Sequence, residues 1–153
     1  MITKGGGDVK KLFLSVLFCI FSVVLVSCSV PYEFSKDMSD LDQIQIEIVN
    51  LESEMGYHAG SSYNEENISV IKIIENEKKE DFLLDFKKIK SYQPNIGSRI
   101  DSITGEAIRI TYPNGDIELI TQYGTATVKN GEVHTQTTTF DSDDFSELLD
   151  KYS

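Results

Sequence analysis

The sequence predicts an α+β domain, in which an antiparallel sheet of about six strands packs two amphipathic helices on one face. Three observations support this fold class. Several short segments alternate apolar and polar residues, which is the period of a strand with one buried face. Two other segments repeat apolar residues at helical spacing. Two Asn-Gly pairs mark tight hairpin turns.

Two strands are predicted before the first helix. In residues 41–51, isoleucines alternate with polar side chains: Ile44, Ile46 and Ile48 with Gln43, Gln45 and Glu47. This alternation predicts a half-buried strand whose polar residues share the other face. Residues 68–75 are rich in β-branched side chains and predict the second strand. Between the two, residues 52–67 are polar and contain Gly56 and Gly60, so we expect a long loop or an irregular hairpin.

Two helices are predicted, one beginning at Asn76 and one over residues 141–152. The first has acids in its first turns and lysines in its last, as the helix dipole favours: Glu77, Glu80 and Asp81, then Lys87, Lys88 and Lys90. Asp141 and Asp144 give the second an acidic start in the manner of a capping box. Each helix carries an apolar stripe that predicts core packing: Phe82, Leu83, Phe86 and Ile89, then Phe145, Leu148, Leu149 and Tyr152. Residues 91–105 contain proline and glycines and predict a loop that returns to the sheet.

Residues 107–136 predict a four-stranded antiparallel meander. The pair Asn130-Gly131 predicts a two-residue turn that places Val128 opposite Val133. The same turn places His134 opposite Thr127. The turn between the two hairpins is expected at Tyr123-Gly124.

The first hairpin of this meander contains Asn114-Gly115. A two-residue turn there would place Ile110 opposite Leu119, so that the register agrees with the hydrophobic pattern. A three-residue turn would instead place Ile110 opposite Glu118. We therefore expect the two-residue turn.

The N-terminal residues have a different character. Residues 1–11 carry three lysines and one acid, and residues 12–26 are apolar except for two serines. A basic stretch followed by an apolar run is typical of a secretory signal. As a helix, the run would span roughly 22–25 Å of a hydrocarbon core nearer 30 Å. An uncleaved membrane anchor is thus the alternative, and it would be short.

The run ends in Leu25-Val26-Ser27-Cys28, which resembles the lipobox of bacterial lipoproteins: an aliphatic residue, a small or aliphatic one, a small one, then cysteine. The resemblance implies that a signal peptidase recognises Leu25, Val26 and Ser27, and that Cys28 receives diacylglyceryl and acyl groups. Two or more acyl chains hold a protein stably on a membrane. The expected location is the extracytoplasmic side of the cell membrane or the outer membrane.

On this interpretation, residues 1–27 are the signal peptide, residues 28–40 the lipidated N-terminus and tether, and residues 41–153 one α+β domain. The tether's aromatic residues, Tyr32 and Phe34, either pack on the domain or lie in the lipid interface. Cys19 is lost with the signal peptide, so the mature chain has Cys28 as its single thiol and no disulfide.

The mature chain is strongly acidic. Residues 1–27 hold three of the 14 basic and one of the 25 acidic side chains, so the remaining 126 residues have 11 and 24 and a formal charge of −13. Phosphate backbones repel such a chain, which argues against nucleic-acid binding. Anionic head groups repel it too, so the lipid anchor and not a basic face would attach it to the membrane.

The domain also resembles small uncharacterised lipoproteins of low-GC bacteria, over roughly residues 41–152. The resemblance lies in a strand pair, an acidic-start helix, a strand at residues 108–112 before Asn114-Gly115-Asp116, and a final Asp-Phe-x-x-Leu-Leu helix. It implies no activity.

Side chains suited to catalysis are few. His58 and His134 are the only histidines, and neither stands in a nucleophile signature. Loop 52–67 is the stretch richest in candidate groups: Glu52, Glu54, Tyr57, His58, Glu65 and Glu66. Asp141, Asp143 and Asp144 lack the glycine and distal glutamate of an EF-hand loop, so helix capping explains them and no metal is expected.

The leading functional hypothesis is therefore a non-enzymatic binding module at the cell envelope, with a protein or cell-wall partner and no cofactor beyond the lipid on Cys28. Two alternatives stay open. One is a small cell-envelope hydrolase that uses loop 52–67. The other is a structural assembly subunit that pairs through the threonine-rich strand edge at Thr135 and residues 137–139.

Overall fold

The computed structural model describes residues 30–52, 56–93, 100 and 102–153. The predicted lipobox, Leu25 to Cys28, and the predicted signal peptide lie outside these residues, as does Glu54. Two short 3-10 turns, Leu41–Gln43 and Glu65–Asn67, accompany the regular elements. These elements are β1 (Gln45–Leu51), β2 (Ile68–Ile73), α2 (Asn76–Phe86), β3 (Ser91–Tyr92), β4 (Gly105–Thr111), β5 (Ile117–Thr121), β6 (Gly124–Lys129), β7 (Glu132–Gln136), β8 (Thr139–Phe140) and α3 (Ser142–Tyr152).

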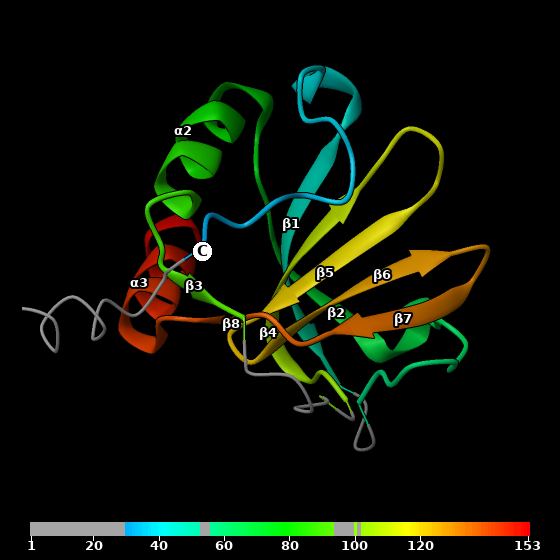
Figure 1. Cartoon of the computed structure of the whole chain (residues 1–153). Coiled ribbons are helices and arrows are strands. Elements are labelled where there is room, and N and C mark those ends of the chain that lie inside the picture. Colours follow the sequence, from blue (N-terminus) through cyan, green and yellow to red (C-terminus); the bar gives the residue numbers. More distant parts are fainter. Residues whose placement is uncertain (1–29, 53–55, 94–99, 101) are drawn as a thin grey trace, which may run out of the picture.

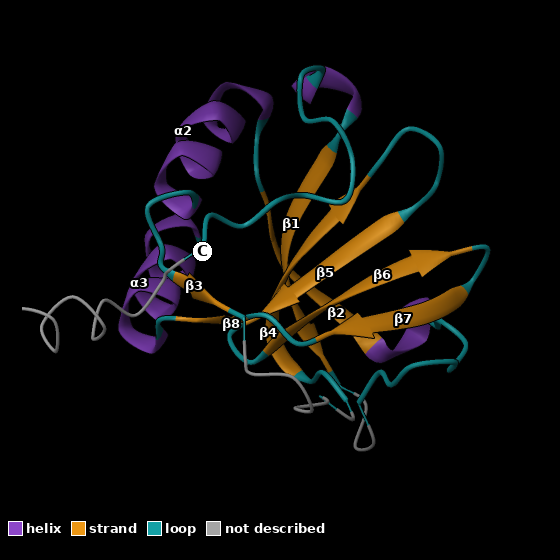
Figure 2. Ribbon diagram, in the orientation of Figure 1, coloured by secondary structure: helices purple, strands orange, loops and turns teal. Residues whose placement is uncertain are grey.

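The main sheet has six strands in the order β2-β1-β4-β5-β6-β7, and every neighbouring pair is antiparallel. β3 and β8 form a separate two-stranded ribbon. Both helices lie to one side of the sheet (Figures 1 and 2). The α+β prediction, with its β4–β7 meander and two helices, is therefore confirmed.

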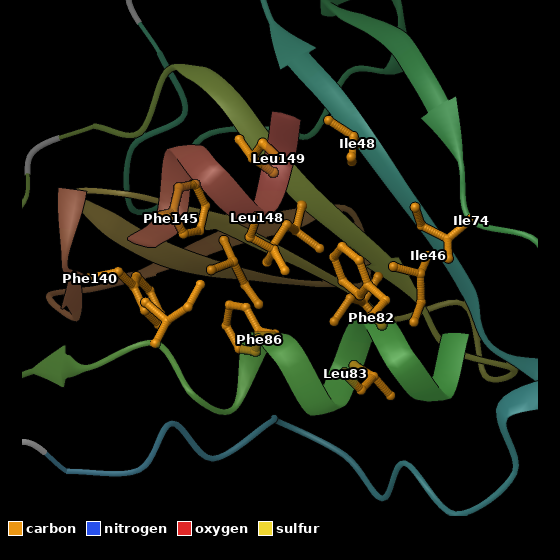
Figure 3. Packing of buried hydrophobic residues seen from close by; sticks show 14 of the residues in the cluster. Ile46, Ile48, Ile74, Phe82, Leu83, Phe86, Phe140, Phe145, Leu148 and Leu149 are labelled. Carbon is orange, nitrogen blue, oxygen red and sulfur yellow. The ribbon is translucent and has the colours of Figure 1, made fainter. Parts of the chain in front are cut away.

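The larger core lies between the helices and the sheet (Figure 3). Isoleucines of β1 and β4 meet both predicted helix stripes there: Ile46, Ile48, Ile108 and Ile110 with Phe82, Leu83, Phe86, Ile89, Phe145, Leu148 and Leu149. Tyr152, the last residue of the second stripe, is partly buried against the same core. Both stripes are core, as their spacing predicts.

A second apolar cluster covers the other face of the sheet. It contains Val49 and Leu51 of β1, Leu119 of β5, and Tyr57 and Ile103 from loops. Glu47 shares this face and is only 2% exposed. The predicted alternation holds at the start of the strand, where Gln43 and Gln45 are exposed and Ile44 and Ile46 are buried. It is wrong from Glu47 onward, because loop residues cover that part of the face.

The first hairpin has a three-residue loop, so its predicted register is wrong. Ile110 lies opposite Glu118, not Leu119. The N–H of Gly115 donates to the carbonyl of Tyr112 at 2.9 Å, and Gly115 has φ of +84°. Pro113 favours the first central position of a type I turn, so Gly115 is left-handed and Asn114 is not, whereas a type I′ turn would need both to be.

The second hairpin has the predicted two-residue turn. Asn130 and Gly131 have φ of +53° and +81°, as a type I′ turn requires. Val128 lies opposite Val133, and Thr127 opposite His134. Between the hairpins, β6 already begins at Gly124, so the turn residues are Gln122 and Tyr123.

The helix ends differ in one respect from expectation. α2 ends at Phe86 and Lys87 is its C-cap, so Lys88 and Lys90 follow the helix. The Asp141 side chain caps α3 by accepting from the N–H groups of Asp143 and Asp144, as predicted.

Candidate functional site

The segment at residues 30–38, which we name the strap, packs on the domain. Tyr32, Phe34 and Met38 lie against the helix-side core. The Tyr32 ring makes edge contacts with Phe86 and Phe140 at centroid distances of 5.7 and 5.3 Å. Of the two places left open for these aromatics, the structure shows packing on the domain.

A buried carboxylate holds the strap from inside. Glu118 is 1% exposed and accepts hydrogen bonds from the hydroxyls of Tyr32 and Tyr112. It also accepts from the N–H and the hydroxyl of Ser35, at 3.0 and 2.9 Å. Burial and the neighbouring Glu118 carboxylate raise the pKa of both tyrosines. Both phenols therefore stay protonated and act as donors.

A second buried charge lies on the opposite face of the sheet. Arg109 is 7% exposed, and its Nε donates to Glu47 at 2.6 Å. Its terminal nitrogen donates to Glu65 at 2.6 Å and to the Tyr63 hydroxyl at 3.2 Å. Burial alone lowers the pKa of Arg109, but the bonds to Glu47 and Tyr63 outweigh it and the net shift is upward. This cluster fastens loop 52–67 onto the sheet.

Loop 52–67 therefore uses its candidate groups in packing. Tyr57 is 3% exposed within the second cluster, and Glu65 is the ion-pair partner of Arg109. His58 and Glu66 are exposed. Among the described residues, no observed side-chain contact joins His58 to a serine, threonine or other nucleophile.

The other candidate residues lie apart from loop 52–67. His134 is exposed on β7, and Asp141 caps α3. Among the described residues, no group of three or more histidines, cysteines or acids is arranged to hold a metal. Nor does any helix of the described part have the length and apolar character to span a bilayer.

A surface ion cluster joins the two helices. The Asp85 carboxylate of α2 accepts hydrogen bonds from Lys88 at 2.7 Å, and from Lys151 and Tyr152 of α3 at 2.6 and 2.8 Å. The bonds from Lys151, Lys88 and Tyr152 lower the pKa of Asp85. A solvent-open pocket of about 260 Å³ lies beside this cluster. Asp85, Lys88 and Lys151 in its wall are already paired with one another, so the cluster holds the two helices together.

The two outer edges of the main sheet differ. Along β7, the N–H of Gly60 donates to the carbonyl of Val133 at 2.8 Å, and the N–H of Val133 donates to Ser61 at 2.9 Å. Loop residues thus cover part of that edge. The threonine-rich stretch expected there is only partly exposed, and Thr138 is buried.

The β2 edge carries exposed apolar side chains instead. Val70, Ile71 and Ile73 are 47%, 44% and 55% exposed. Lys72 pairs with Ile48 and Val70 with Val49, so Ile71 is an extra residue that forms a bulge. The edge of β2 was not recognised as a candidate site from the sequence, because the run of β-branched residues is equally typical of a buried strand.

A pocket of about 180 Å³ adjoins the end of β2, and the charged side chains in its lining are those of Lys72, Glu75, Lys78 and Lys151. Lys78 pairs with Glu75 at 3.9 Å, and Lys151 pairs with Asp85 at 2.6 Å. Within the described residues, Lys72 has no ion-pair partner. An apolar strand edge thus lies beside an unpaired cation.

The comparisons with known proteins add no relative to this description. No protein-family model, no curated protein and no solved structure matches the chain.

Proposed function

We propose that the protein is a lipid-anchored binding protein of the extracytoplasmic membrane surface, and that β2 pairs with an extended segment of a partner protein. The anchor rests on the sequence Leu25-Val26-Ser27-Cys28. The binding surface rests on one observation, the contrast between the partly covered β7 edge and the open, apolar β2 edge.

An exposed strand edge offers unpaired N–H and C=O groups to an incoming strand. Here the side chains of Val70, Ile71 and Ile73 add apolar surface that the folded domain leaves in water. Lys72 would favour a carboxylate on the incoming strand. The partner segment is therefore extended, mainly apolar, and acidic at one position.

Two features of β2 restrict pairing to a matching partner. The bulge at Ile71 interrupts the regular ladder, and Lys72 places a charge on the edge. Natural sheets use both devices against indiscriminate edge-to-edge association. A second copy of this chain offers another Lys72 and no matching acid within β2 itself.

The two buried carboxylates are bound to structural partners, which favours a binding role over a catalytic one. Glu47 pairs with Arg109, and Glu118 accepts from the strap. The hydrolase alternative rested on loop 52–67, where Tyr57 is packed and Glu65 is paired.

The anchor is tested by replacing Cys28 with serine in the full-length protein and following incorporation of labelled fatty acid. We expect acyl labelling and cleavage at this site to be lost. Undiminished labelling of Cys28→Ser would refute the lipoprotein assignment.

The β2 edge is tested in cells that produce the full-length protein with a photo-crosslinking residue in place of Ile73 or of Leu84. Leu84 is a matched control, because it is apolar and 52% exposed but lies on α2. We expect one adduct from position 73 only, and its loss when Ile71→Pro is added. Equal adducts from both positions, or an adduct with a second copy of this chain, would contradict the proposal.

A further inference from the structure

The strap begins at the first described residue. The N–H of Val30 donates to the carbonyl of Ser91 at 3.2 Å, and the Ser91 hydroxyl donates back to the carbonyl of Val30. Val30 and Ser91 thus form an antiparallel bridge at the start of β3. The backbone is attached to the domain from residue 30 onward.

The attachment continues along the strap. Tyr32 and Ser35 bind Glu118, and the Phe34 ring lies 5.6 Å from that of Phe86. Lys36 pairs with Asp116 at 2.9 Å. Four residues of the strap thus contact three parts of the domain, namely β5, α2 and the turn before β5, so the strap cannot extend away from the domain.

Cys28 lies only two positions before Val30 in the sequence. Two residues span at most about 7 Å, whereas a free tether of the twelve residues that follow Cys28, 29–40, would reach roughly 40 Å. A lipid on Cys28 would thus hold the bridge at Val30 and Ser91 close to the head groups.

We propose that the lipidated domain lies directly on the membrane, with the start of β3 and the end of α2 facing the lipid head groups. This inference rests on the lipid anchor of the proposed function. The domain then has a fixed orientation on the membrane, and does not move on the free tether expected for residues 28–40.

The surface around Ser91 suits this position. Lys87 and Lys90 are exposed, and neither has an ion-pair partner within the described residues. They are among the few cations of an acidic chain, and Lys90 directly precedes Ser91 while Lys87 lies four positions before it. Anionic head groups attract such lysines within about a Debye length. The N–H of Asp141 donates to the carbonyl of Lys90 at 3.0 Å, so acids of α3 lie nearby and the short connection must supply the orientation.

The opposite end of the molecule is the β6–β7 turn. In Figure 1 this turn lies far from β3 and from the blue start of the strap. Lys129, at the end of β6, is exposed there and serves as the distant reference position.

The test uses the lipidated full chain reconstituted into phosphatidylglycerol and phosphatidylethanolamine vesicles. Because Cys28 would be blocked by lipid and Cys19 removed, Lys90→Cys or Lys129→Cys gives a single free thiol for a fluorophore. Quenching by spin-labelled head groups is measured at each position. We expect at least threefold stronger quenching at position 90 than at position 129.

A variant with twelve Gly and Ser residues inserted between Ser29 and Val30 is the control, and we expect it to abolish the difference. Equal quenching at both positions in a chain that carries the acyl label and stays on the vesicles would overturn this inference alone. A chain without acyl label that does not bind vesicles would overturn the proposed anchor, and the orientation with it.

Discussion

The Glu118 carboxylate accepts four hydrogen bonds, from Tyr32, Tyr112 and twice from Ser35, and is 1% exposed. Glu118→Gln keeps the shape of the side chain but removes its charge and turns one acceptor oxygen into a donor. A hydrogen bond to a charged group contributes about 1.5–3 kcal/mol, and a buried donor without acceptor costs about 1–3 kcal/mol. We therefore expect this substitution to lower the free energy of unfolding by about 2–4 kcal/mol.

Urea unfolding followed by circular dichroism measures this loss. Tyr32→Phe removes one donor and should cost about 1 kcal/mol. Tyr123→Phe is the matched control, because Tyr123 is 68% exposed, and we expect a change below about 0.5 kcal/mol. A Glu118→Gln stability within about 0.5 kcal/mol of the parent would refute the role given to this carboxylate.

Amide exchange separates loosening of the strap from global unfolding. In Glu118→Gln the N–H of Ser35 donates to a neutral amide oxygen at best, and no longer to a carboxylate, so its exchange should quicken more than exchange within β4. A double-mutant cycle of Glu118→Gln with Tyr32→Phe should give a coupling energy above about 0.5 kcal/mol. Simple additivity would show that the two side chains do not act together.

Other substitutions and changes of pH give further predictions. Arg109→Met leaves Glu47 buried and unpaired, so we expect a loss of about 3–5 kcal/mol in urea unfolding, whereas Glu65→Gln, at the exposed end of the same cluster, should cost under about 1 kcal/mol. Because folding raises the pKa of Tyr112 above its ordinary value near 10, the protonated phenol stabilises the fold fully below pH 10. This stability is lost as the pH rises above 10, by about 1.4 kcal/mol per pH unit. Unfolding at pH 9 to 11 should therefore show a shallower decline for Tyr112→Phe, and an equal slope would contradict this. Because folding lowers the pKa of Asp85, its carboxylate stabilises the fold above pH 3.8, and this stability is lost as the pH falls below 3.8. Asp85→Asn should therefore flatten the acid side of the plot of stability against pH.

The two hairpins show how far local sequence carries the fold. Asn130-Gly131 follows Lys129, which tolerates any turn, and the predicted register is correct. Asn114-Gly115 follows Pro113, whose fixed φ suits a type I turn and lengthens the loop by one residue. Pro113 was a usable signal. The predicted register assumes instead that a glutamate does not face the core.

That assumption failed because the partners of Glu118 are remote in sequence. Tyr32 and Ser35 precede it by 86 and 83 residues, and nothing local marks them as donors. Glu47 and Arg109 are likewise 62 residues apart. A buried charge becomes tolerable only when tertiary structure supplies its hydrogen bonds, so periodicity cannot predict it.

The candidate binding edge depends on topology in the same way. The composition of β2 predicts a strand, but whether Val70, Ile71 and Ile73 are covered depends on which strand lies beyond it. β1 pairs with β2 on one side and with β4 on the other, which leaves β2 outermost. A meander that continued in chain order would instead have placed β4 next to β2 and paired its outer backbone groups. The crossover from β2 to β4 through α2 therefore creates the exposed edge, and the same path carries the chain to Ser91, which forms the bridge with Val30 at the start of the strap. The exposed edge and the strap attachment thus both depend on the path of the chain from β2 to β4, and periodicity predicts α2 on that path but not where the path leads.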